Sequence, residues 1–223
     1  MRKTNNETKK IATLGILCAA AYLLMFFIRI PIASIGPTPL NYEPKDVIIV
    51  MGGFLYGPLY AFMMSVVVSL IEMVTISTTG IIGCVMNVVS TTGFACTASF
   101  IYRRKMTLNT AVIGLTVGVV AATGVMLLWN WLLVPVFMKV DRAMVVPLLL
   151  TLFAPFNLVK YGINAVLAIL LFKPVMVVLN KANLIEPAIT GKRSTLIKWI
   201  FVAVSLVAVT VLLMYVYNPP AAA

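Results

Sequence analysis

The sequence predicts an all-α membrane protein: a bundle of six transmembrane helices followed by one additional C-terminal transmembrane helix. Of the 223 residues, 62% are hydrophobic and only 10% are charged, and the mean hydropathy is +1.07. Soluble domains carry roughly a quarter charged residues, because their surfaces face water. So low a charge content indicates that much of the surface faces lipid, and the apolar segments give the helix count.

Seven apolar runs predict the helices, and charged residues, proline or glycine mark where each one ends. In chain order the predicted helices span residues 11–30, 46–56, 59–76, 82–102, 110–138, 155–179 and 199–217. The first run is longer than the hydrophobic part of a signal peptide and has no small-residue cleavage site, so we expect it to remain in the protein. Residues 31–39 form a Pro- and Gly-rich loop after it.

The second predicted helix is too short to cross a hydrocarbon layer of about 30 Å at about 1.5 Å per residue, so we expect its neighbours to shield it. Further along, an apolar stretch at 143–153 leads to Pro155, a residue that favours the first turn of a helix. The predicted domains are the six-helix membrane domain at 1–181, a cytoplasmic linker at 182–198 and the additional helix at 199–217.

The distribution of lysine and arginine predicts that the N-terminus is cytoplasmic. Basic residues are concentrated before the first helix, after the fourth and around the linker, in segments on one side of the membrane. The opposite loops hold only Arg29, Lys45, Lys139 and Arg142. Because cytoplasmic loops carry the excess of positive charge, the N-terminus lies inside and the last helix ends outside.

Composition also excludes several functions. The formal net charge of +11 comes from residues between apolar runs, so it does not indicate nucleic-acid binding. The chain has no histidine, and Cys18, Cys84 and Cys96 lack metal-site spacing, so we expect no metal and no cofactor. No nucleophile–base pair favours an enzyme. A phosphate-binding loop is also missing, because the Gly-Lys pair at 191–192 lacks the earlier glycine.

Polar residues at membrane depth are costly and therefore indicate function. Such residues, together with the first loop, lie toward the predicted outer side at Leu40, Tyr42, Asn87, Asn130, Asn157 and Lys160. We interpret them as an outward-open pocket for a small, flat, polar molecule. The alternative is that each asparagine satisfies a nearby backbone group and that Lys160 extends to the membrane interface.

Two rows of small residues predict close helix contacts. They are Ala12, Gly15 and Ala19 in the first helix, and Gly114, Gly118 and Ala122 in the fifth. Packing within the chain and contact with another membrane protein both explain such rows.

Five segments carry a family resemblance. They are residues 40–46 (LNYEPKD), 51–58 (MGGFLYGP), 86–87 (MN), 129–137 (WNWLLVPVF) and 155–160 (PFNLVK). These segments resemble motifs of the riboflavin-specific substrate-binding component of energy-coupling factor (ECF) transporters. The resemblance covers about residues 8–181, and its Pro-Phe-Asn-x-x-Lys element is the most specific.

The resemblance implies a six-helix fold that binds riboflavin near the outer face, as a transported ligand and not as a cofactor. In this family the first helix docks on a transmembrane coupling subunit through small residues, which are Ala12, Gly15 and Ala19 here. Two ATP-binding cassette (ABC) ATPases use ATP to supply the energy, in keeping with the missing phosphate-binding loop. The binding component is pictured as rotating in the cytoplasmic membrane to present its pocket inward.

A flavin suits the polar residues of the predicted pocket. Asn130 or Asn157 would bind the pyrimidine edge of the isoalloxazine ring, and Lys160 would donate to a ring carbonyl or to the ribityl chain. Tyr42 and Trp129 would pack on the ring system.

The ribityl hydroxyls would bind Asn87 and the backbone of Thr79 and Gly80. Two features depart from the family pattern: Glu43 stands where aspartate is more frequent, and the helix at 199–217 lies beyond the six. A component for another vitamin or precursor, a membrane-embedded enzyme and a stand-alone facilitator remain as alternatives.

Overall fold

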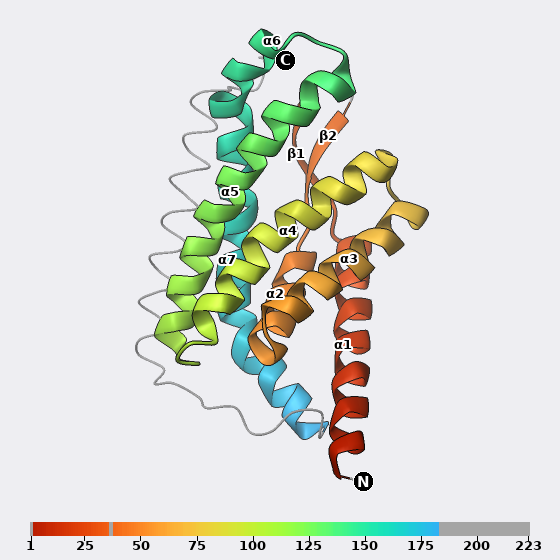
Figure 1. Cartoon of the computed structure of the whole chain (residues 1–223), viewed down its shortest axis with the longest axis vertical. Helices are drawn as coiled ribbons and strands as arrows, with labels where there is room; N and C mark the ends of the chain where they lie inside the picture. The colour runs from red at the N-terminus through yellow and green to blue at the C-terminus, as the bar shows by residue number, and fades with distance from the viewer. Residues whose placement is uncertain (1, 36–37, 183–223) are drawn as a thin grey trace.

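The apolar runs of the sequence form long helices, and a short hairpin lies at one end of the bundle (Figure 1). The computed structural model describes residues 2–35 and 38–182. In chain order the elements are α1 (Arg2–Phe27), β1 (Ile30–Ile35), β2 (Thr38–Tyr42), α2 (Lys45–Tyr56), α3 (Pro58–Thr75), α4 (Gly80–Tyr102), α5 (Leu108–Met138), α6 (Arg142–Leu148), the π-helical turn η1 (Leu149–Phe153) and α7 (Ala154–Lys181).

Five helical stretches are long and apolar enough to cross a membrane. They are Glu7–Phe27, Pro58–Thr75, Gly80–Tyr102, Leu108–Met138 and Arg142–Lys181. One more helix belongs to the bundle: α2 has 12 residues and is shorter than a full span. The predicted helical membrane bundle is therefore confirmed, whereas the predicted linker beyond residue 182 and the helix at 199–217 lie outside the described residues.

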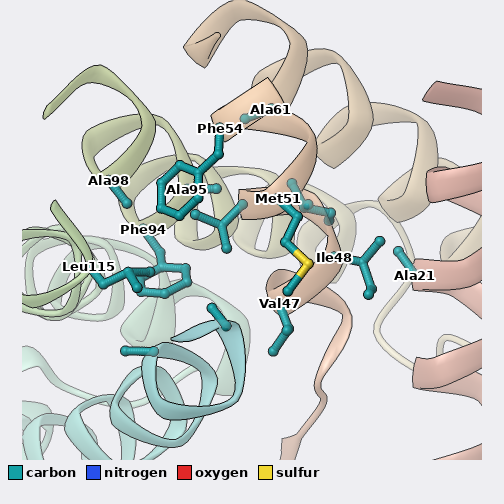
Figure 2. Packing of buried hydrophobic residues seen from close by; sticks show 14 of the residues in the cluster. Ala21, Val47, Ile48, Met51, Phe54, Ala61, Phe94, Ala95, Ala98 and Leu115 are labelled. Carbon is teal, nitrogen blue, oxygen red and sulfur yellow. The ribbon is translucent and has the colours of Figure 1, made fainter. Parts of the chain in front are cut away.

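The short helix α2 is buried at every position from Lys45 to Phe54. Figure 2 shows the side chains of this core: Val47, Ile48, Met51 and Phe54 of α2 lie among Ala21 of α1, Ala61 of α3, and Phe94, Ala95 and Ala98 of α4. Its neighbours therefore shield α2 from lipid, as its length predicts.

Residues 31–39 include two paired strands, so the prediction of an irregular loop is wrong. The strands β1 and β2 run antiparallel from the pair Ile30–Tyr42 to the pair Ile35–Thr38. Prolines at 31 and 39 concealed this hairpin, because proline is rare inside sheets. Both strands of a two-stranded ribbon are edge strands. Proline is tolerated on an edge strand, although it has no N–H to donate to a neighbouring strand. The register shifts between Pro31 and Ala33.

The stretch 143–153 is also helical, so the last described helical run begins before Pro155. Asp141 accepts a hydrogen bond from the Ala143 N–H at 2.9 Å and caps α6. The π-helical turn η1 then joins α6 to α7, and Pro155 lies in the first turn of α7 as predicted. Such turns widen a helix locally and are frequent at functional sites.

The small-residue row of α5 packs inside the chain, against α4. A Cβ atom added to Gly114 would lie 2.6 Å from the carbonyl oxygen of Ala98, and one added to Gly118 would lie 2.8 Å from that of Phe94. Gly15 of α1 differs, because an added Cβ would meet nothing within 4 Å. Of the two interpretations, internal packing holds for α5, and the row on α1 is left exposed at Ala12, Gly15 and Ala19.

We expect Gly114→Val to destabilise the protein, because the new side chain must push the α4 backbone away, and overpacking of this kind costs about 1–3 kcal/mol. The measurement is thermal unfolding of the purified protein in detergent. Gly15→Val is the matched control and should leave the unfolding temperature unchanged. Equal unfolding temperatures for the two variants would contradict the close α4–α5 contact.

Candidate ligand-binding site

A cavity lies at the hairpin end of the bundle, where β2, α3, α4, α5, η1 and α7 meet. The volume of the cavity is about 170 Å³. Its apolar wall includes Ile82, Met86, Met126, Leu133, Val134, Phe137, Phe153 and Phe156. Its polar wall includes Arg29, Asn41, Glu43, Glu72, Ser90, Asn87, Asn130, Asn157 and Lys160. A mostly apolar cavity with a few convergent polar groups is typical of small-molecule sites.

The structure brings most of the sequence-predicted site residues to this cavity. Those that line it are Leu40, Thr79, Asn87, Asn130, Asn157 and Lys160. Tyr42, Gly80 and Trp129 are not among its lining residues. The aromatic side chains of Phe153 and Phe156 stand at the cavity wall instead.

Tyr42 is buried beside a second polar cluster. Its hydroxyl donates to Asn164 Oδ1 at 3.0 Å, and Asn164 Nδ2 donates to Asp46 Oδ2 at 3.2 Å. Asp46 also accepts from the Thr91 hydroxyl at 2.6 Å. Tyr42 therefore ties the end of the hairpin to α7 and α2, and it is not among the residues that line the cavity.

Asn130 and Lys160 are buried, and their polar groups lack hydrogen bonds among the described residues, although the Lys160 ammonium group lies 5.7 Å from the centre of the Tyr161 ring. Only 2% of Asn130 and 7% of Lys160 is exposed, and neither side chain has a hydrogen bond or an ion pair with any described residue. Burying an amide or an ammonium group without a partner is costly, above all at membrane depth. Both side chains line the cavity, so a ligand there would supply the missing partners.

Asn157 is half satisfied by its own helix. Its Nδ2 donates to the Phe153 carbonyl at 2.7 Å. Because a carbonyl oxygen only accepts, this contact fixes the amide orientation and leaves Oδ1 without a partner among the described residues. The alternative that each asparagine serves a backbone group therefore holds for one half of this amide, and the other half remains free for a ligand.

Four charged side chains form a network beside the cavity, three of which (Arg29, Glu43 and Glu72) line it, and the sequence did not predict this network. Arg29 Nε lies 3.0 Å from Glu43 Oε1, and Lys45 Nζ lies 3.0 Å from Glu43 Oε2. Glu72 pairs closely with Lys45 and also lies 3.7 Å from Arg29. Two positive and two negative charges balance, which makes their burial tolerable.

Burial opposes the charged form of Glu43, but Lys45, Lys160 and Arg29 together hold its pKa below the ordinary value. Three of the four network residues lie in or next to the predicted first loop and second helix. The sequence offered one indication of the network: charges of opposite sign lie next to a helix that is too short to span the membrane. In the sequence, Arg29 and Lys45 were assigned only to outer loops, because contacts between α1, α2 and α3 are not visible there.

Comparison with known proteins agrees with this architecture. Residues 9–172 match the family described as "ECF transporter, substrate-specific component", and the chain belongs to that family. The chain is thus a substrate-specific membrane component of a transporter and not an enzyme. The helices and the family together make it a multi-pass membrane protein.

Two relatives are informative. The riboflavin transporter RibU of Staphylococcus aureus (strain TCH60) is 27% identical over 179 residues, which cover 77% of this chain and 93% of the relative. A solved structure of the S component of a bacterial ECF transporter superposes with a TM-score of 0.64 at 23% identity. The superposition covers 78% of this chain and 98% of the solved chain, and it supports the fold.

Proposed function

We propose that this protein binds riboflavin with high affinity and determines substrate specificity for riboflavin uptake across the cytoplasmic membrane. The observation that carries the proposal is the pair of buried side chains at the cavity, Asn130 and Lys160, which make no hydrogen bond or ion pair with another described residue. The relative from Staphylococcus aureus, described as a riboflavin transporter, supports the choice of ligand.

The pyrimidine edge of isoalloxazine alternates carbonyl acceptors with an N–H donor. The Lys160 ammonium group would donate to a ring carbonyl, and Asn157 Oδ1 would accept from the ring N–H. These two residues lie three positions apart on α7, so one helix face offers a donor next to an acceptor. Asn130, on α5, offers both kinds of group.

The rest of the ring system needs apolar contacts. Phe153 and Phe156 line the cavity near the start of α7, and Met126 and Val134 line it from α5. In our proposal these side chains take the packing role that the sequence had assigned to Tyr42 and Trp129. Aromatic and methionine side chains suit a flat, polarisable ring.

Uptake would require partners. A transmembrane coupling subunit and two ABC ATPases would supply the energy, and the exposed row Ala12, Gly15 and Ala19 on α1 would be the docking face for the coupling subunit. No other part of the described chain packs on Gly15, because a Cβ atom added there would meet no atom within 4 Å.

We expect Gly15→Leu to leave riboflavin binding unchanged and to lower uptake by roughly tenfold or more, because one bulky side chain prevents close helix approach. Uptake is measured in vesicles that contain the protein, its coupling subunit and the ATPases. Gly124→Leu is the matched control, since Gly124 on α5 is exposed and an added Cβ there also meets nothing within 4 Å. Equal uptake by the two variants would count against docking through this face.

The cytoplasmic orientation of the N-terminus is part of the proposal. The start of α1, the α4–α5 turn and the end of α7 lie at the end of the bundle away from the hairpin (Figure 1). This end carries the basic residues Lys9, Lys10, Arg103, Arg104, Lys105 and Lys181. The positive-inside tendency then favours a cavity that opens outward.

Titration of the purified, ligand-free protein with riboflavin, thiamine and biotin tests the proposed ligand. Flavin fluorescence should be quenched at a ratio of one riboflavin per chain, and calorimetry should detect no binding of the other two vitamins. Binding of thiamine or biotin without binding of riboflavin would overturn the proposal in favour of another vitamin.

A further inference from the structure

Asn87 stands on a different wall of the cavity from Asn130, Asn157 and Lys160, and its amide is held by a carboxylate. Asn87 belongs to α4, and its Nδ2 donates to Glu72 Oε2 of α3 at 2.8 Å. An ionised carboxylate only accepts hydrogen bonds, so this contact can form only with the NH₂ group turned toward Glu72. The remaining polar atom, Asn87 Oδ1, has no hydrogen-bond partner among the described residues and belongs to a lining side chain.

Glu72 is itself fixed by two cations. Its Oε2 pairs with Lys45, and its Oε1 lies 3.7 Å from Arg29. The side chain is 2% exposed, so its orientation is set by these contacts and not by solvent. Both carboxylate oxygens of Glu72 therefore lie beside N–H donors, and a carboxylate group accepts the hydrogen bond from Asn87 Nδ2.

We infer that Glu72 is a positioning residue for the ligand: it holds Asn87 so that the Asn87 carbonyl accepts a hydrogen bond from a ligand hydroxyl. This inference rests on the proposed function and assigns the α3–α4 wall to the polyol chain of the flavin. The ring edge is bound by the donor and acceptor pair on α7, whereas a chain of hydroxyl groups supplies the donors that a fixed carbonyl requires.

The experiment compares two flavins with the same ring system. Riboflavin carries the ribityl chain, and lumiflavin has a methyl group in its place. Dissociation constants of both are measured by fluorescence quenching on the purified full-length wild type and on Glu72→Gln, Glu72→Asp, Asn87→Ala and the double variant Glu72→Gln/Asn87→Ala.

Glu72→Gln allows the Asn87 amide to turn either way, and it should weaken riboflavin binding by about tenfold while changing lumiflavin binding less than about twofold. Asn87→Ala should give the same pattern. The double variant should bind riboflavin no worse than Asn87→Ala alone, because Glu72 acts through Asn87. Glu72→Asp keeps the charge that balances Lys45 but moves the carboxylate away from Asn87, so it should reproduce the selective loss even if Glu72→Gln folds poorly.

Asp46→Asn is the matched control, since it also converts a buried carboxylate to an amide but does not line the cavity. It should leave the ratio of the two dissociation constants unchanged. An equal loss of both flavins in the two Glu72 variants, or multiplied losses in the double variant, would overturn the inference alone. A wild type that binds neither flavin would overturn the proposed function and this inference with it.

Discussion

Lys160→Met is expected to weaken riboflavin binding by roughly 10- to 100-fold, because a charged donor to a buried ring carbonyl is lost. The same change removes a buried ammonium group that makes no hydrogen bond or ion pair with a described residue, and methionine fills a similar volume. The variant should therefore unfold at the same or a higher temperature than wild type, a stabilisation of about 0–3 kcal/mol.

Fluorescence titration and thermal unfolding on the same detergent samples give both quantities. Lys173→Met is the matched control, because Lys173 is an exposed lysine further along the same helix. Lys173→Met should change neither the riboflavin affinity nor the unfolding temperature. Loss of binding together with a large drop in unfolding temperature would contradict our account, since Lys160 would then have a structural partner.

Lys45→Met is expected to have the largest effect on stability. Lys45 lies between Glu43 and Glu72 and is fully buried, so its removal leaves two buried carboxylates with Arg29 as their one remaining ion-pair partner among the described residues. Removing one member of a buried ion network typically costs about 3–5 kcal/mol. Thermal unfolding in detergent should show a lower unfolding temperature.

A second substitution tests whether charge is the cause. In the double variant Lys45→Met/Glu72→Gln, Arg29 and Glu43 form a balanced pair, so the double variant should unfold at a higher temperature than Lys45→Met alone. If the stability losses caused by Lys45→Met and by Glu72→Gln simply add, then Lys45→Met destabilises the protein through lost packing and not through uncompensated charge.

The sequence predicted the helices and much of the site for the same physical reason. A lipid-facing protein must carry long apolar runs, and polar residues inside them stand out. Asn130 and Lys160 could be predicted as site residues, because burying a polar side chain at membrane depth costs free energy and usually indicates a function. The short second helix was also predictable, because its length alone required shielding by its neighbours.

The missed features depend on contacts between elements. Arg29 and Glu43 look like ordinary loop charges until the hairpin folds back over the bundle and buries them beside Glu72. The hairpin was missed because Pro31 and Pro39 are typical of loops, and only the pairing of two edges makes them acceptable in strands. The hydrogen bond from Tyr42 to Asn164 was missed for a similar reason, since the two residues are distant in the sequence.

The most direct test of the central claim is a crystal structure of the protein with riboflavin bound. Our account predicts the isoalloxazine ring in the cavity between α5 and α7, with the Lys160 ammonium group within hydrogen-bond distance of a ring carbonyl. It also predicts that Asn130 makes a hydrogen bond to the ligand. A flavin bound elsewhere, with Asn130 and Lys160 still without partners, would contradict it.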